Sequence, residues 1–203
     1  MHRRALAHLR AADPVLAGII ERVGPCQLKP ATDLTHFEAV ARSIVYQQLS
    51  GKAAGTIHGR FAALFPDHRP TPHALLALET PVLRAAGLSR GKAAYLQDLA
   101  TRVVAGEVPI EGLADLPDAE VIGHLTRVKG VGVWTAQMFL LFRLGRPDVL
   151  PDLDLGVQKA MQLAYRMRRL PSPERVRKVG AKWAPWRSIA TWYLWRSIDG
   201  DAA

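Results

Sequence analysis

The chain has 203 residues, of which 27 are Lys or Arg and 18 are Asp or Glu, so its formal charge is +9 and its pI is near 10.2. This length suits one domain or two small lobes, and the charge favours a polyanionic partner, although charge alone leaves an ordinary basic protein equally open. The single cysteine, Cys26, excludes an internal disulfide and a four-cysteine metal site. No signal peptide follows the basic N-terminus, and the longest apolar run, residues 138–142, is too short to cross a bilayer, so we expect a cytoplasmic protein without membrane contacts.

Capping signals open most of the helices predicted in the first half of the chain. Residues 35–38 are spaced as a capping box, and the apolar residues behind them repeat at helical spacing. Ser50-Gly51 breaks that helix before another begins. Thr71-Pro72 and Thr80-Pro81 each indicate an N-cap followed by proline at the first helical position, and a further helix is predicted over 89–106.

The second half continues as helices separated by short polar breaks. A stripe over 119–128 predicts one buried helix face, and after the turn at 129–132 a helix that is apolar nearly all round runs over 133–144. Residues 172–174 open another helix, and Pro185 precedes a last one that carries several tryptophans. With hardly any alternating strand pattern, the chain is predicted to be all-α, with nine or ten helices.

The turn Lys129-Gly130-Val131-Gly132 has a specific physical consequence. Glycine admits positive φ and lacks a Cβ, so the N–H groups of Gly130, Gly132 and Val133 can approach a phosphate at the N-terminus of the next helix. An isolated G-x-G more often only ends one helix and lets the next begin. Here apolar anchors precede the turn and a buried helix follows at once, and together they resemble the helix-hairpin-helix motif of DNA-binding proteins.

Three aspartates, Asp148, Asp152 and Asp154, follow this hairpin within seven residues. Taken alone, Asp152 or Asp154 would be a helix cap. A hairpin followed by such a loop resembles the helix-hairpin-helix superfamily of DNA glycosylases, in which the aspartate is catalytic. The pattern L-D-L-G-V aligns Asp154, rather than Asp152, with that carboxylate.

Several further stretches resemble the AlkA-like 3-methyladenine DNA glycosylases over about residues 15–198. The stretches are ARSIVYQQLSGKAAGTI, GLSRGKAAYLQDLA, LTRVKGVGVWTAQMFLLF, LDLGVQKA and KWAPWRSIATWYLW. The resemblance implies a single glycosylase core without the additional N-terminal domain of some relatives. It also implies two helical lobes with a DNA-binding cleft between them: residues 29–146, with the hairpin at 120–143, and residues 147–203 packed with 1–28.

The chemistry of this family fits one carboxylate. An N-alkylated purine carries a positive charge and departs readily, so the difficult species is the oxocarbenium-like sugar, which Asp154 would stabilise. The base must first be flipped out of the duplex and the gap filled. In the resemblance the filler is Gln48 or, as second choice, Leu49, although Gln47 and Gln48 could simply end a helix. Trp134 and Trp195 match pocket positions that stack on a cationic base, and Trp192 is a third candidate.

Trp134 also takes the place at which relatives that cleave the DNA strand carry a Schiff-base lysine. We therefore predict a monofunctional glycosylase that needs no cofactor. Basic loop residues are expected to meet phosphate collectively, although each could be an ordinary surface charge; they are Lys52, Arg90, Lys92 and Lys129. Similar hairpins hold a structural Na⁺ or K⁺ through carbonyl groups, here those of Thr126, Val128 and Val131. The expected partner is double-stranded damaged DNA, bound by a monomer.

Two alternatives stay open. A non-catalytic DNA-binding or damage-recognition module would use the same hairpin, and substitution of Asp154 by Asn would then change nothing measurable. The same fold could act on oxidised or mismatched bases; the absent lysine and cysteines weigh against this, but a monofunctional mismatch enzyme would pass that test. A metal-dependent nuclease is less favoured, because the seven histidines form no cluster with carboxylates in the sequence.

Overall fold

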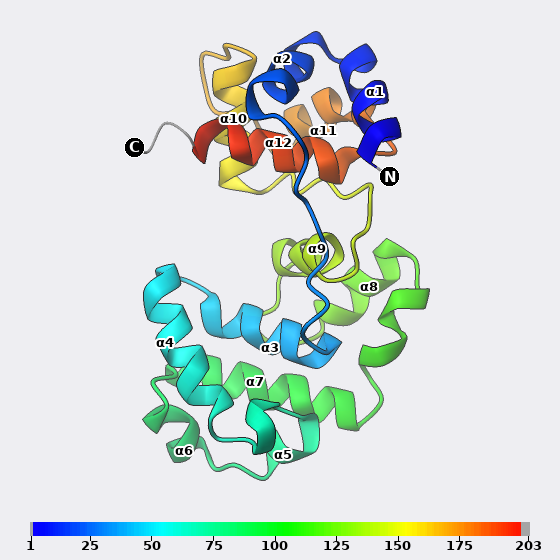
Figure 1. Ribbon diagram of the computed structural model, residues 1–203. Coiled ribbons are helices and arrows are strands. Elements are labelled where there is room, and N and C mark those ends of the chain that lie inside the picture. Colours follow the sequence, from blue (N-terminus) through cyan, green and yellow to red (C-terminus); the bar gives the residue numbers. More distant parts are fainter. Residues whose placement is uncertain (1, 200–203) are drawn as a thin grey trace. The chain divides into compact units, whose positions relative to one another are not determined.

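The computed structural model describes residues 2–199, which form twelve α-helices and three 3-10 helices and contain no strand (Figure 1). The predicted all-α class is confirmed, while the predicted number of helices is too low. One reason is that Asp13 accepts hydrogen bonds from the N–H groups of Val15 and Leu16 and so starts a second helix within residues 2–23. The predicted ranges 1–28 and 147–203 extend beyond the described residues, at residue 1 and at 200–203.

Several predicted caps are present. Thr35 and Glu38 form the reciprocal capping box, and the side chains of Thr71, Ser89 and Ser172 each accept a hydrogen bond from the first turn of their helix. The cap predicted at Thr80 is wrong by one residue, because the helix starts at Thr80 itself. The Thr80 hydroxyl instead donates to the Gln97 side-chain oxygen at 3.3 Å.

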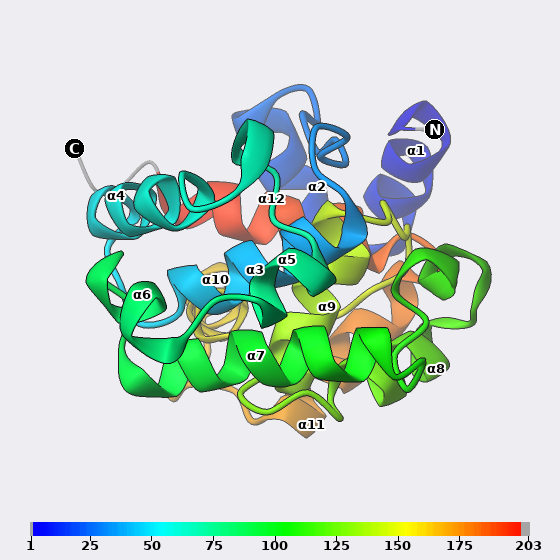
Figure 2. The same cartoon turned by 90° about the horizontal axis from the view of Figure 1, so that it is seen from below.

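The chain divides by its internal contacts into two compact units, and the first, the hairpin unit, comprises residues 31–139. Its elements are α3 (His36–Tyr46), α4 (Gly51–Ala62), η1 (Pro66–His68), α5 (Pro72–Leu76), α6 (Thr80–Ala85), α7 (Arg90–Val104), η2 (Ile110–Asp115) and α8 (Asp118–Leu125). The long helix α7 packs against α3, α5 and α6, while α6 and α8 lie near its opposite ends (Figures 1 and 2). The large side chains buried in this unit include Phe37, Ile44, Phe61, Leu75, Leu83, Leu96 and Leu99.

The second unit, the terminal unit, comprises residues 2–30 and 140–199 of the described chain. Its elements are α1 (His2–Ala12), α2 (Pro14–Val23), α10 (Leu155–Ala164), α11 (Pro173–Gly180), η3 (Ala181–Trp183) and α12 (Arg187–Asp199). The central helix α12 contacts α1, α2 and α10. The buried core of the unit includes Leu9, Leu16, Ile20, Met161, Trp183 and Tyr193.

Helix α9 (Val133–Phe142) begins in the hairpin unit and ends in the terminal unit. It stops two residues before the predicted end at Leu144. Gly145 adopts a φ of +64°, and the N–H group of Arg146 donates to the Leu140 carbonyl at 2.9 Å, which closes the helix end. Within residues 2–199, no helix is both long and apolar enough to cross a membrane.

Candidate functional site

The turn between α8 and α9 is built so that its two glycines have different surroundings. Gly130 has a φ of +77°, and a Cβ there would lie 2.2 Å from the Tyr95 ring. Both the backbone conformation and the contact with Tyr95 therefore disfavour any residue larger than glycine. A Cβ on Gly132 would meet no atom within 4 Å, and Gly132 is exposed. Packing within the protein therefore explains Gly130, whereas Gly132 leaves open space in front of the N-terminus of α9.

Asp98 of α7 fixes the first residue of the turn. Its carboxylate accepts the backbone N–H of Lys129 at 2.9 Å and the Arg102 side chain at 2.9 Å. Burial alone would raise the pKa of Asp98, but these hydrogen bonds and the charges of Arg102 and Lys129 lower it overall. The Lys129 ammonium lies 3.6 Å from the same carboxylate, on a side chain that is 70% exposed. The turn thus keeps its shape while its lysine stays accessible.

The loop between α3 and α4 is fastened to this turn and to α7. The Gln47 side chain donates to the Gly130 carbonyl at 2.8 Å. The Lys92 ammonium donates to the carbonyls of Val45 and Gln47 at 2.7 and 2.6 Å, at the C-terminus of α3, and burial lowers its pKa. Lys92 therefore holds the loop in place, a structural task that its predicted role in phosphate binding did not include.

The predicted wedge residues lie at the tip of that loop. Gln48 adopts a φ of +56°, which is uncommon for a residue other than glycine, and is exposed. The neighbouring Leu49 is 38% exposed. A strained, outward position held by Gln47 and Lys92 is compatible with insertion into DNA, and the choice between Gln48 and Leu49 stays a prediction.

Trp134 lines a cavity of about 700 Å³ that lies wholly within the hairpin unit. The other lining residues come from α3, the following loop, α7 and the hairpin; among them are Ser43, Tyr46, Gln48, Lys92, Tyr95 and Met138. Trp134 is 44% exposed. The cavity joins a large aromatic face with a few polar groups, as small planar ligands require.

Asp154 is the N-cap of α10, and one of its oxygens is held by two donors. That oxygen, Oδ1, accepts the Val157 N–H at 2.7 Å and the indole N–H of Trp195 at 2.9 Å. A Cβ on Gly156 would lie 3.0 Å from the same oxygen and 3.1 Å from the Trp195 ring, so glycine at this position makes room for their contact. The carboxylate is thus fixed in one orientation.

The other residues predicted near Asp154 differ in their surroundings. Asp152 lies in the loop before α10, where it forms an ion pair with Arg177 and its carbonyl accepts the Gln158 side chain at 3.0 Å. Trp195 stacks on Phe142 with 5.8 Å between ring centroids. Trp192 is only 8% exposed and belongs to the core of the terminal unit.

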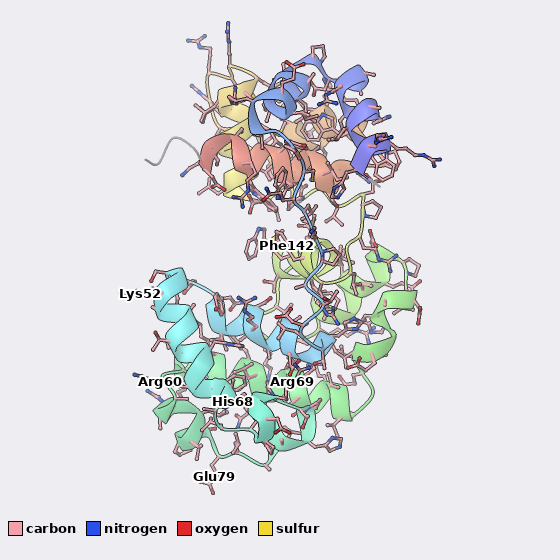
Figure 3. All side chains as sticks on the ribbon, viewed as in Figure 1. Lys52, Arg60, His68, Arg69, Glu79 and Phe142 are labelled. Atoms are coloured by element: carbon pink, nitrogen blue, oxygen red, sulfur yellow. The ribbon has the colours of Figure 1, made fainter. Side chains whose placement is uncertain are left out.

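The predicted site residues divide between the two units. Asp154, Trp192 and Trp195 lie in the terminal unit, and all other predicted site residues lie in the hairpin unit. Lys52 is exposed near the N-terminal end of α4 (Figure 3), and Arg90 is exposed at the start of α7. Among the described residues, no group of three or more His, Cys, Asp or Glu side chains could hold a metal ion.

Four supporting residues are missing from the sequence prediction. They are Tyr95, Asp98, Gly156 and Gln47. The sequence predicts Gln47 only as a possible helix end, whereas its side chain connects the loop after α3 to the hairpin turn. Gly156 alone left a signal, since glycine inside the first turn of a helix is unfavourable unless something needs its small size. The others contact residues that lie 31 to 83 positions away in the sequence, and no local pattern marks such contacts.

The family model of the HhH-GPD superfamily base excision DNA repair proteins matches residues 41–185. The chain belongs to this family. Among curated members, DNA-3-methyladenine glycosylase 1 of Schizosaccharomyces pombe is 32% identical over 96% of this chain and 86% of its own length.

Two solved structures of the family extend the likeness to the fold. The 3-methyladenine DNA glycosylase of S. pombe in complex with abasic DNA is 31% identical, with a TM-score of 0.85 over 97% of each chain. The DNA-3-methyladenine glycosidase of Bacillus halodurans is 33% identical, with a TM-score of 0.86 over 98% of this chain and 91% of that one. The all-α fold is therefore the helical fold of the HhH-GPD DNA glycosylases.

Proposed function

We propose that this chain is a monofunctional DNA glycosylase, acting as a monomer, that excises alkylated purines such as 3-methyladenine from double-stranded DNA. The observation that carries the proposal is the orientation of Asp154, fixed by the Val157 and Trp195 N–H groups, in a member of the base excision family. Relatives named for release of 3-methyladenine support the substrate class.

The reaction follows from the charge of the substrate. The cationic base departs with both electrons of the C1′–N bond and becomes neutral, and the positive charge passes to the sugar. The Asp154 carboxylate stabilises that cation, and it accepts a proton from the water that adds to C1′. The products are the free base and an abasic site in an intact strand.

The hairpin unit supplies binding. The N–H groups of the exposed residues Gly132 and Val133 face phosphate, and Gln48 or Leu49 fills the gap left by the flipped nucleotide. Trp134 offers its face to the cationic base. Lys52, Arg90 and Lys129 add positive charge at the same unit, and Lys92 acts mainly by holding the loop of Gln48.

A monovalent cation fits the hairpin chemically. The carbonyls of Thr126, Val128 and Val131 are neutral oxygen donors, and the Val128 carbonyl uses one lone pair to accept the Val131 N–H at 3.0 Å, which leaves the other for a ligand. A Na⁺ or K⁺ ion at these oxygens would bridge the turn to a phosphate.

We expect the purified protein to release methylated purines, separable by chromatography, from alkylated duplex DNA. Because Trp134 stands where strand-cleaving relatives place lysine, we expect no covalent adduct with the same DNA under borohydride and no strand cleavage before alkali treatment. An adduct would refute the monofunctional assignment. Absence of base release, with DNA binding intact, would instead favour the non-catalytic module or another lesion class.

Two alanine substitutions should separate the roles of the hairpin glycines. Gly130→Ala must place its Cβ against Tyr95 at a positive φ, so we expect it to lower the free energy of unfolding by about 2 kcal/mol. Gly132→Ala meets no atom of the protein, so stability should hold while affinity for duplex DNA falls. Urea unfolding and fluorescence anisotropy measure the two effects.

The matched control is Gly123→Ala, an exposed glycine of α8 whose added Cβ also meets no atom within 4 Å. It should leave DNA affinity at the level of the unsubstituted protein. If Gly132→Ala binds DNA as tightly as Gly123→Ala does, the turn does not approach phosphate closely.

A further inference from the structure

Positive charge is divided unevenly between the two units. The sequence of the terminal unit, residues 1–30 and 140–203, carries 17 Lys and Arg against 8 Asp and Glu, whereas the hairpin unit carries ten of each. The whole net charge of +9 therefore belongs to the terminal unit. The phosphate-binding turn lies in a unit without net charge, so attraction to a polyanion must arise largely elsewhere.

One exposed face of α10 leads from Asp154 towards a group of basic residues. Asp154 caps the helix, and the positions that follow at intervals of four are exposed: Leu155 at 52%, Lys159, and Leu163 at 65%. Arg166 lies two residues beyond Ala164, the last residue of the helix, and is exposed with a φ of +51°. The exposed face thus begins beside the catalytic carboxylate and carries Lys159, and the chain that follows the helix is basic.

Arg168 and Arg169 complete this group. They line the same shallow hollow, and both are exposed. Residues 155–173 contain no Asp or Glu. Within the described part of the chain, Lys159 and these three arginines form no ion pair, whereas Arg177, Lys182 and Arg187 of the same unit are all paired with aspartates.

Helix stabilisation does not explain all of these charges. Arg166 lies at the C-terminus of α10, where the helix dipole favours a cation. Arg168 and Arg169 lie four and three residues before Ser172, the N-cap of α11, so the dipole of neither helix stabilises them. An anion seated in their hollow would neutralise these two adjacent charges.

We propose that Lys159, Arg166, Arg168 and Arg169, here termed the α10 basic surface, bind backbone phosphates of the substrate duplex on one side of the lesion. The inference rests on the proposed function, since Asp154 marks the nucleotide that reacts. Ten residues of helix span about 15 Å. Because DNA rises about 3.4 Å per base pair, this length of helix corresponds to about four base pairs between that nucleotide and the phosphates that the arginines contact.

The test is the salt dependence of binding to a duplex that contains an abasic site, measured by fluorescence anisotropy for the full chain. Each phosphate contact contributes about 0.9 to the slope of log K against log salt concentration. We expect Arg168→Ala/Arg169→Ala to reduce that slope by between about 1 and 2. Arg168→Lys/Arg169→Lys keeps the charge and should retain most of the slope.

A control variant distinguishes local contacts from net charge. Arg3→Ala/Arg4→Ala removes the same charge from exposed positions of α1 in the same unit and should change the slope much less. A duplex that ends about three base pairs from the abasic site on the contacted side lacks the phosphates in question. The unsubstituted protein and the Arg168→Ala/Arg169→Ala variant should bind this duplex with equal affinity. Thermal unfolding should be the same for all variants, because every substituted side chain is exposed.

Equal slopes for the Arg168→Ala/Arg169→Ala variant and the unsubstituted protein would overturn the proposal and leave the surface to an acidic protein partner. Equal losses in both double variants would also overturn it, since general attraction would then suffice. Base release at saturating protein should be unchanged in every variant. Failure of the unsubstituted protein to release base would count against the proposed function and not against the α10 basic surface.

Discussion

We expect Asp154→Asn to lower the single-turnover rate of base release by about 100-fold or more, while affinity for abasic DNA stays near that of the unsubstituted protein. The substitution removes the negative charge that stabilises the sugar cation. It keeps an oxygen that can accept the Val157 and Trp195 N–H groups, and asparagine is a good N-cap, so α10 should remain folded. The readout is chromatography of the bases released from alkylated duplex DNA.

Asp152→Asn is the matched control, because it removes the same charge two residues away. Asp152 is paired with Arg177 and holds a loop, so its substitution should alter the rate by no more than a few fold. Equal loss of activity in both variants would show that the local field, and not one positioned carboxylate, drives the reaction. Full activity of Asp154→Asn would remove Asp154 from the mechanism.

Local sequence signals predict where many helices begin, because capping chemistry acts within four residues. Thr35, Ser89 and Ser172 illustrate this, since each meets its partner inside the same turn. Thr80 shows the limit of such signals. Its hydroxyl contacts Gln97 on another helix, so a residue suited to a cap serves a tertiary contact instead.

For the candidate site, as for the helix starts, the sequence predicts local features and misses contacts between distant residues. The sequence pattern predicts Asp154 as the reacting carboxylate and the glycines of the hairpin as phosphate contacts, because the family spacing is local. It does not show that Tyr95 excludes a side chain at Gly130, or that Lys92 closes the end of α3. These contacts depend on how α7 packs within its unit, which periodicity in the sequence does not determine.

Asp13→Asn should lower the free energy of unfolding by about 3 kcal/mol. The Asp13 carboxylate is fully buried, caps α2, and accepts hydrogen bonds from the Tyr165 hydroxyl and from the Trp183 indole at 2.8 Å. The Lys182 ammonium lies 3.1 Å from it. An amide nitrogen in place of Oδ2 would face the Trp183 N–H and the Lys182 ammonium, which can only donate, so both would lose their partner. Urea denaturation at neutral pH measures the loss.

The pH dependence of stability gives a second readout of the same group. Burial alone would raise the pKa of Asp13, but hydrogen bonds from Tyr165, Trp183, Lys182 and the Leu16 N–H lower it overall. The stability that it contributes is therefore present above 3.8, the ordinary pKa of aspartate, and is lost as pH falls towards its lower folded value. Asp13→Asn should lack this acid-dependent component.

Glu21→Gln supplies the control for both measurements, since Glu21 is exposed on the same helix and its substitution should change stability by less than about 0.5 kcal/mol. A small effect of Asp13→Asn at neutral pH would mean that the three donors find other partners when the carboxylate is gone. If Asp13→Asn lowers the free energy of unfolding strongly at neutral pH but leaves its decrease at acid pH unchanged, Asp13 acts through packing and capping alone. Loss of both the stability at neutral pH and its decrease at acid pH would identify one buried carboxylate as the link between α2, the C-terminus of α10 and η3.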